Sequence, residues 1–220
     1  MEKDRATPFT PLQPSAVVHV VDDDSSVRTA VSRVLRASGY NVSQYASANQ
    51  LLENLPVAAR GCVLLDLQMP GLDGSQLQEA LGKIEFELPI IFLSGHGDIP
   101  ASVRAIKAGA EDFLSKPASK KVLVEAIERA LKRYDEMHER HVRLSTLREY
   151  FSALTPREHQ VFALVVRGKL NKQIAYDLGT SERTIKAHRH GIMEKFKAKS
   201  LAELVSIAEL LGILNASANN

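Results

Sequence analysis

Apolar residues in the first part of the chain occur in short runs that alternate with amphipathic stretches. Residues 17–21 form an apolar run typical of a buried strand. Val27, Val31 and Leu35 then recur at the spacing of a helix face. Gly39 follows this stretch and is expected to end the helix, because glycine adopts the left-handed conformation readily. The pattern predicts a strand followed by a helix.

The strand–helix unit then repeats. Further strands are expected at residues 40–45, 62–66, 89–94 and 111–115, and further helices at 48–55, 73–81, 99–108 and from about Ser119. Strands joined by crossovers of this length run parallel. Five strands alternating with five helices therefore predict an α/β fold, a doubly wound parallel sheet.

Beyond residue 150 the sequence has helix signals and no strand pattern. Thr155, Pro156 and Glu158 supply an N-cap, a proline at the first helical position and a capping box. Ser200 and Glu203 offer a second box. Helices are expected at residues 156–167, 171–178, 181–197 and 200–211, with Gly168 and Gly179 between them. This part is predicted to be a small all-α domain.

Residues 119–150 are expected to form one long helix that joins the two parts. Its apolar stripe follows a heptad-like spacing through Leu123, Ile127, Ala130, Tyr134, Met137, His141 and Leu144. Packing on the chain's own sheet explains the first half of the stripe, and the second half equally fits a dimerising coiled coil. The predicted organisation is a flexible tail 1–15, an α/β domain 16–130, a helical linker 131–150, an all-α domain 151–214 and a flexible tail 215–220.

Charge is distributed unevenly along the chain. Residues 1–130 hold 13 Lys and Arg against 16 Asp and Glu, a net −3, whereas residues 151–220 hold 10 against 6, a net +4. The basic part is therefore a candidate for binding nucleic acid. Apolar runs fall short of the roughly 20 residues that span a bilayer, and the N-terminus is charged, so we expect a cytoplasmic protein without membrane contact. Cys62, the only cysteine, is expected in the core.

Carboxylates collect at the predicted strand ends. Asp22, Asp23 and Asp24 follow the first strand, and Asp66 ends the third. In a flavodoxin-like sheet of order 2-1-3-4-5, these two strands flank the crevice in which ligands bind. Carboxylates that converge need a compensating cation, and oxygen ligands favour Mg²⁺. Asp24 has a second interpretation, since Asp after a strand often caps the next helix.

Two more polar residues end the remaining strands on that side of the sheet. Ser94 ends the fourth strand and supplies a hydroxyl, and Lys116 ends the fifth and supplies an ammonium. A metal ion and an ammonium neutralise phosphoryl oxygens while a carboxylate attacks in line. The set is suited to phosphoryl transfer.

The segments "VVDDD", "LLDLQMPGLDG", "FLSGHGDI" and "AIKAGAEDFLSKP" resemble the receiver domain of two-component response regulators over residues 16–130. The resemblance implies that Asp66 accepts a phosphoryl group from a sensor histidine kinase. It also implies that Asp22, Asp23 and Asp66 hold Mg²⁺ with the backbone carbonyl of Gln68.

The same resemblance assigns three further residues. Lys116, before a cis proline, and Ser94 would contact the phosphoryl group, and Phe113 would reorient on activation. The chain departs from a close subgroup at Ala118, where that subgroup often has Phe, which alters a contact surface and not the chemistry.

The basic part contains a helix-turn-helix pattern in "NKQIAYDLGTSERTIKAHRHGIMEKF". Gly179 permits the turn, and Thr180 or Ser181 can cap the second helix. Spacings of seven and four turn Ile185, Ile192 and Phe196 inward, which leaves Arg183, Lys186, Ala187 and His190 outside. Lys and Arg on that face can bond guanine edges or phosphates.

Residues 151–212, which include "LTPREHQV" and "KSLAEL", resemble the LuxR-type DNA-binding domain, and the pair of domains resembles the NarL/FixJ class. The resemblance implies that the helix 181–197 enters the major groove. Lys186, Ala187 and His190 would then read bases, while Lys172, Thr184, His188 and Lys195 would touch phosphates. Binding as a homodimer to two half-sites is expected.

The sequence thus predicts a phosphorylation-dependent transcriptional regulator, not a turnover enzyme. Its expected partners are a sensor histidine kinase, promoter DNA, a second copy of itself and RNA polymerase. Two alternatives stay open. Asp22 and Asp24 also fit the nucleophile motif of haloacid-dehalogenase-type phosphatases, although that assignment leaves Asp66 unexplained. A receiver could also act without phosphorylation, as a dimerisation module.

Overall fold

The computed structural model describes residues 16–55, 60–84, 86–95 and 99–214. The tails predicted at 1–15 and 215–220 lie outside these residues. The chain divides into two compact units, Met1–Met137 and His138–Asn220, and the division falls within the predicted helical linker.

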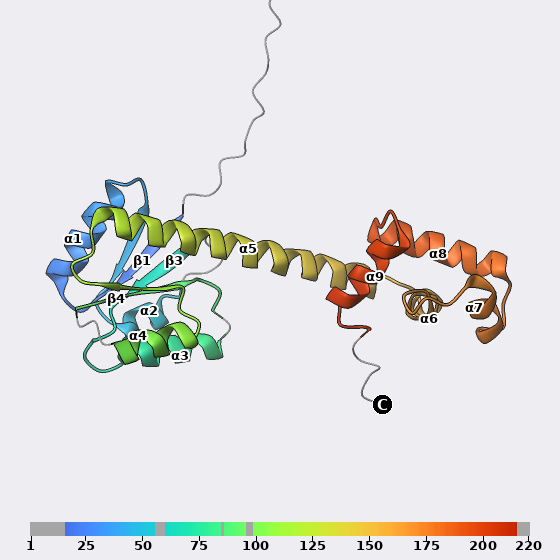
Figure 1. Cartoon of the computed structure of the whole chain (residues 1–220), viewed down its shortest axis with the longest axis horizontal. Coiled ribbons are helices and arrows are strands. Elements are labelled where there is room, and N and C mark those ends of the chain that lie inside the picture. Colours follow the sequence, from blue (N-terminus) through green and yellow to red (C-terminus); the bar gives the residue numbers. More distant parts are fainter. Residues whose placement is uncertain (1–15, 56–59, 85, 96–98, 215–220) are drawn as a thin grey trace, which may run out of the picture. The chain divides into compact units, whose positions relative to one another are not determined.

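A five-stranded parallel sheet forms the centre of the first unit (Figure 1). Its strand order is β2-β1-β3-β4-β5, which confirms the predicted order. The strands are β1 (Val17–Val21), β2 (Asn41–Tyr45), β3 (Gly61–Leu65), β4 (Ile90–Ser94) and β5 (Asp112–Ser115). Strands β3 and β4 are buried at every position, as expected of central strands that are covered on both faces.

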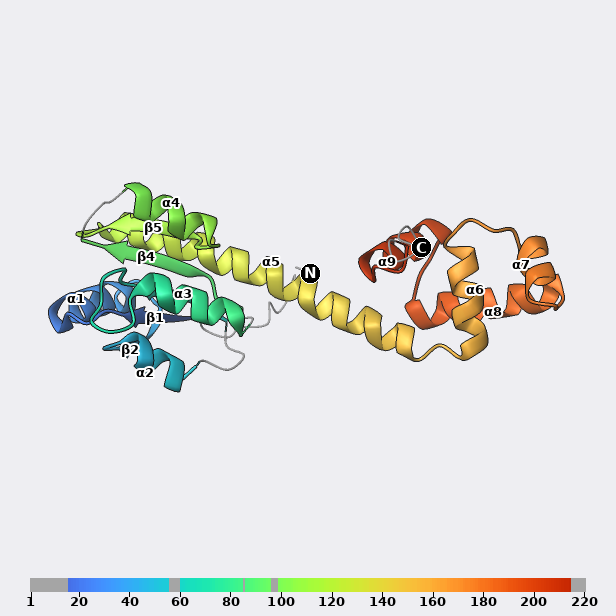
Figure 2. The same ribbon diagram turned by 90° about the horizontal axis from the view of Figure 1, so that it is seen from below.

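Helices cover both faces of this sheet (Figures 1 and 2). One face carries α1 (Ser25–Arg36) and the first part of α5 (Lys120–Ser152), and the other carries α2 (Ala48–Glu53), α3 (Gly74–Lys83) and α4 (Ile99–Lys107). Each face has its own apolar cluster. Cys62 is fully buried in one of them, which confirms its predicted place, and burial raises the pKa of its thiol to about 12.

Helix α5 begins as a core helix of the first unit. Ile127 and Ala130 are fully buried, so packing on the sheet explains the first half of the predicted stripe. Arg60, beside the start of β3, also holds α5 through two hydrogen bonds of 2.7 and 2.6 Å to the Asp135 carboxylate. Further along, Met137 is 43% exposed, so the second half of the stripe departs from this core. The coiled coil stays a prediction.

Helices are the only regular elements among the described residues of the second unit, as predicted. The end of α5 is followed by α6 (Pro156–Val165), α7 (Asn171–Asp177), α8 (Glu182–Phe196) and α9 (Leu201–Leu210). The capping box of Thr155 and Glu158 is present, and Ser200 accepts a hydrogen bond from the Glu203 N–H at 3.1 Å. Helix α6 ends at Val165, slightly before the predicted position, because the chain turns at Gly168. Within the described part of the chain, no helix is long and apolar enough to cross a membrane.

Candidate functional site

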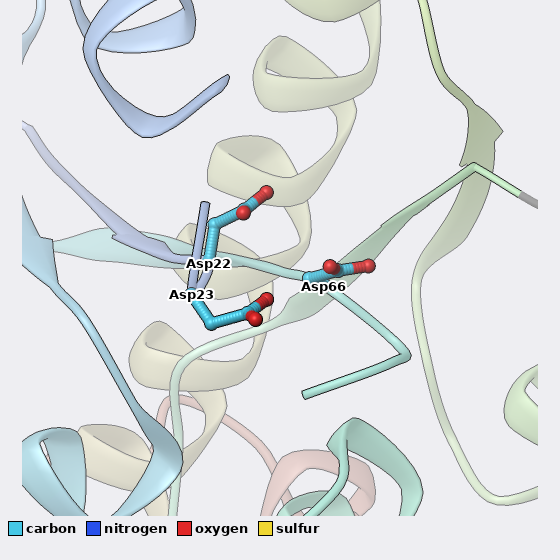
Figure 3. A group of neighbouring side chains, drawn as sticks. All are labelled: Asp22, Asp23 and Asp66. Carbon is cyan, nitrogen blue, oxygen red and sulfur yellow. The ribbon is translucent and has the colours of Figure 1, made fainter. Parts of the chain in front are cut away.

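The register of the sheet brings the predicted carboxylates together. Val21 of β1 pairs with Leu65 of β3, so Asp22 and Asp66 are the next residues on neighbouring strands. The Asp66 N–H donates to the Val21 carbonyl at 2.8 Å, which continues the ladder to the strand end. Oxygens of Asp22, Asp23 and Asp66 all lie within 4.8 Å of one another (Figure 3). Asp22 and Asp66 are buried, and Asp23 is exposed.

Lys116 reaches the same place from the end of β5. Its N–H donates to the Ser94 carbonyl at 2.7 Å, and its Nζ lies 2.7 Å from Asp22 Oδ2 and 3.0 Å from Asp66 Oδ2. Burial alone would lower the pKa of this ammonium, but the hydrogen bonds to the two carboxylates outweigh it and raise the pKa. The bond from Lys116 to Pro117 is cis, as the resemblance implied.

The adjacent aspartates have different surroundings. Burial raises the pKa of the Asp22 carboxyl, although the hydrogen bond from Lys116 acts in the opposite direction. The Asp24 carboxylate instead accepts hydrogen bonds from the N–H groups of Ser26 at 2.7 Å and Val27 at 3.3 Å. These two bonds lower the pKa of Asp24, which is exposed. Asp24 therefore caps α1, as one interpretation of the sequence predicted.

The donor set fits a divalent cation. Three carboxylates meet, two of them buried, and Lys116 brings a single positive charge to them. Oxygen donors of this kind suit a hard cation that keeps part of its water shell. The Gln68 N–H lies 3.4 Å from Asp66 Oδ1, so Gln68 is beside the carboxylate, while a metal bond from its carbonyl stays a prediction.

Arg28 belongs to this site, and sequence reasoning missed it. Its Nη1 donates to the Asp22 carbonyl at 2.5 Å and to the Asp23 carbonyl at 3.3 Å. The guanidinium, on the first turns of α1, thus holds the backbone at Asp22 and Asp23 in place. In the sequence, Arg28 is one of several polar residues of a helix that follows a run of aspartates, and this position alone does not indicate a contact with the site.

Gly74 is a second residue that the sequence did not single out. It begins α3, and a Cβ added there would lie 2.4 Å from the Asp66 carbonyl oxygen and 2.9 Å from the Phe92 ring. Only glycine permits α3 to approach the phosphoacceptor candidate so closely. The motif "MPGLDG" contains this residue, but its spacing gives no indication of the contact.

Two other candidates lie on neighbouring strands. Ser94 is fully buried at the end of β4 and pairs in register with Ser115 of β5. Phe113 is half-buried in β5, and its ring centroid lies 6.1 Å from that of Phe92. A reorientation of Phe113 stays a prediction.

The second unit contains the predicted helix-turn-helix. Helices α7 and α8 are joined through Gly179, whose φ of 61° is left-handed, and Ser181 caps α8 by accepting from the Thr184 N–H at 3.1 Å. Ile185, Ile192 and Phe196 are buried, which confirms the predicted inner face. Exposed positions of α8 include Arg183, Lys186, Ala187 and His190. These are the residues that the sequence placed outside.

The four predicted phosphate contacts differ in their surroundings. Lys172 of α7 is exposed, Thr184 is hydrogen-bonded to the Ser181 hydroxyl at 2.9 Å, and His188 is half-buried. Lys195 has partners inside the unit: its Nζ lies 2.6 Å from Glu158 Oε2 and 3.1 Å from the Ala153 carbonyl. Its ammonium is thus engaged by protein groups, a contact that the sequence did not reveal.

Known protein families match both parts of the chain. The response regulator receiver domain matches residues 18–128, and the luxR family of bacterial regulatory proteins matches residues 152–208. The response regulator protein TodT of Pseudomonas putida is 43% identical over 197 residues, covering 90% of this chain and 87% of TodT.

Two solved structures extend over both units. The response regulator StyR has a TM-score of 0.78 and 45% identity, with 89% of this chain and 98% of StyR covered. Full-length FixJ from B. japonicum has a TM-score of 0.56 and 36% identity, with 91% of this chain and 98% of FixJ covered. The chain therefore belongs to the two-component response regulators of the NarL/FixJ class, transcriptional regulators that join a receiver domain to a LuxR-type DNA-binding domain.

Proposed function

We propose that Asp66 accepts a phosphoryl group from a sensor histidine kinase in the presence of Mg²⁺, and that the phosphorylated chain dimerises on promoter DNA. The observation that carries the proposal is the meeting of three carboxylates and one ammonium at the carboxyl edge of the sheet. Such a set can neutralise a phosphoryl group on three sides while one carboxylate acts as the nucleophile.

In the proposed reaction, a carboxylate oxygen of Asp66 attacks the phosphorus of the kinase phosphohistidine. A P–O bond forms, the P–N bond breaks, and Asp66 becomes an acyl phosphate. Asp22, Asp23, Asp66 and the Gln68 carbonyl would hold Mg²⁺, which when bound supplies charge neutralisation for the phosphoryl oxygens. Lys116 exchanges its contact with Asp66 for a phosphoryl oxygen, and the Ser94 hydroxyl donates to another. The chain is thus an acceptor whose product stays attached, not a turnover enzyme.

The metal assignment is tested by two neighbouring substitutions. Asp23→Ala removes an exposed carboxylate of the cluster and is expected to weaken Mg²⁺ affinity at least about tenfold, the effect of losing one ligand contribution of about 1.4 kcal/mol. Asp24→Asn keeps the cap of α1, since Asn caps as well as Asp, and is expected to bind Mg²⁺ as the wild type does. Calorimetric titration of Mg²⁺ into each protein measures both, and equal affinities for the two variants would contradict the assignment.

The output surface is proposed to involve α4 and β5. A phosphoryl group adds about −1.5 to −2 charges, by analogy with other phosphorylated side chains. In response to the phosphoryl group, the side chains of Ser94 and Phe113 reorient, and this change rebuilds the α4–β5 surface for dimerisation. Its apolar character supports the proposal: on α4, Ile99 is 76% exposed, and Val103 and Ile106 are each 46% exposed.

On DNA, α8 is proposed to enter the major groove. Lys186, Ala187 and His190 read bases, and Arg183 bonds bases or phosphates, because these side chains share the exposed face of the helix. Lys172, Thr184 and His188 contact phosphates. Two half-sites would lie about 34 to 36 Å apart, one helical turn, or a multiple of it. RNA polymerase is proposed as a further partner of the bound dimer.

Lys186→Ala tests the reading face. We expect a loss of about 1–3 kcal/mol of discrimination between a duplex selected by the wild type from a random library and a scrambled duplex. Lys199→Ala is the control, because Lys199 is exposed in the turn after α8 and outside the proposed interface. Competition binding measures the ratio, and wild-type discrimination by Lys186→Ala would exclude Lys186 from base reading.

The phosphatase alternative receives no support from the geometry. It requires the Asp24 carboxylate to belong to the site together with Asp22, whereas this carboxylate accepts hydrogen bonds from the N–H groups of Ser26 and Val27 as the cap of α1.

A further inference from the structure

We propose that Glu158 and Lys195 form a positioning pair that fixes the orientation of α8 for DNA reading. This inference rests on the proposed function, because it assigns the pair a role in that interface. It also gives Lys195 a different role from the phosphate contact that the resemblance implied.

The Glu158 side chain ties the start of α6 to α8. Glu158 is only 7% exposed, and its Oε2 accepts from the Thr155 N–H at 2.7 Å and from the Lys195 ammonium at 2.6 Å. Burial alone would raise the pKa of this carboxyl, but the hydrogen bonds from Lys195 and Thr155 outweigh it and lower the pKa to about 2. The carboxylate therefore stays charged at neutral pH and keeps both partners.

A second contact of α8 falls on the same carboxylate. Gly191 lies one helical turn before Lys195, and a Cβ added there would be 3.1 Å from Glu158 Oε1. Lys195 also donates to the Ala153 carbonyl at 3.1 Å, just before α6. One ridge of α8 is thus held against the α6 start by a close backbone approach and by a charged hydrogen bond.

This ridge lies away from the proposed reading face. Lys195 follows Lys186 by nine residues, and at 3.6 residues per turn this is about two and a half turns, so the two side chains leave α8 in opposite directions. When Lys186 faces the groove, Lys195 faces the α6 start. The pair therefore sets how α8 is rotated about its own axis, and this rotation decides which side chains meet the base edges.

The test uses the full-length chain and two 30-base-pair duplexes, one selected by the wild type from a random library and one scrambled. Glu158→Gln keeps an amide oxygen that can accept the Thr155 N–H, and Lys195→Met keeps the length of the side chain without its charge. We expect each variant to bind the selected duplex about tenfold more weakly, which is the effect of losing one charged hydrogen bond. Affinity for the scrambled duplex should be unchanged. The double variant should have the same affinities as the single variants, because both substitutions remove the same interaction. Lys199→Met is the control for loss of a lysine charge.

Salt dependence separates positioning from phosphate contact. A lysine that touches a phosphate contributes about 0.9 to the slope of log affinity against log salt concentration. If Lys195 touched a phosphate, Lys195→Met would lower this slope and Glu158→Gln would not. Such a difference between the two variants, or wild-type discrimination between the duplexes by both of them, would overturn the proposal. Gly191→Ala adds a methyl group close to the Glu158 carboxylate without changing any charge, and it should also reduce discrimination between the two duplexes. Circular dichroism at the assay temperature checks that each variant is folded. A wild type that selects no duplex at all would instead contradict the proposed function.

Discussion

Asp66→Asn is expected to abolish phosphoryl labelling. The side chain keeps its shape, so β3 and its neighbours should pack as before, but an amide oxygen is a far weaker nucleophile than a carboxylate and cannot form a stable acyl phosphate. The loss of one charge also leaves Lys116 with Asp22 as its remaining carboxylate partner. Incubation with radiolabelled acetyl phosphate and Mg²⁺, followed by gel autoradiography, measures the effect.

The matched control for this prediction is Asp24→Asn. It makes the same chemical change two residues beyond Asp22, at a carboxylate whose function is to cap α1, and Asn is an equally good N-cap. We expect wild-type labelling for this variant. If Asp66→Asn is labelled as strongly as the wild type, the nucleophile is another residue, and a label on Asp22 would revive the phosphatase alternative.

The architecture of the first unit was predictable because one simple pattern carries it. Apolar runs bounded by amphipathic stretches specify strand and helix alternation, and parallel crossovers of this length restrict the topology. Bounds were less accurate. The helix expected at 48–55 ends at Glu53, because the end of a helix depends on local hydrogen bonds that apolar spacing does not encode.

The site was predictable only where strand ends specify it. Asp22 and Asp66 follow paired residues of adjacent strands, so their meeting follows from the sheet order. The contacts of Arg28 and Gly74 depend on how a side chain and a helix start approach the strand ends, and no residue spacing expresses that. The position of Lys116 between two carboxylates likewise requires the geometry of the loop after β5.

In the second unit, periodicity separated the faces of α8 correctly but did not identify partners. Ile185 and Ile192 are buried as expected. Lys195, a charged residue of a basic helix, was expected to contact a phosphate, yet its ammonium is bound to the buried carboxylate of Glu158 on α6. A basic residue on a helix therefore has an interpretable role only when the opposite helix is known.

Phosphorylation is expected to raise affinity for a duplex with two half-sites by about a hundredfold, because a dimer binds the second half-site at the effective concentration set by the first. The apolar side chains exposed on α4 give the phosphorylated chain a surface through which to dimerise. Titration of a duplex selected by the wild type, at one fixed salt concentration, with and without acetyl phosphate and Mg²⁺, measures the change. Sedimentation of the same samples reports whether dimers form.

Two controls determine whether this gain arises from dimerisation by phosphorylated Asp66. A duplex with one half-site scrambled offers no second site, so phosphorylation should raise its affinity little. Asp66→Asn should bind the intact duplex equally with and without acetyl phosphate. If the wild type also binds the intact duplex equally under both conditions, while sedimenting as a dimer throughout, the receiver acts as a dimerisation module without phosphorylation. An equal gain on both duplexes would mean that the phosphoryl group acts within one chain, by changing the access of DNA to α8.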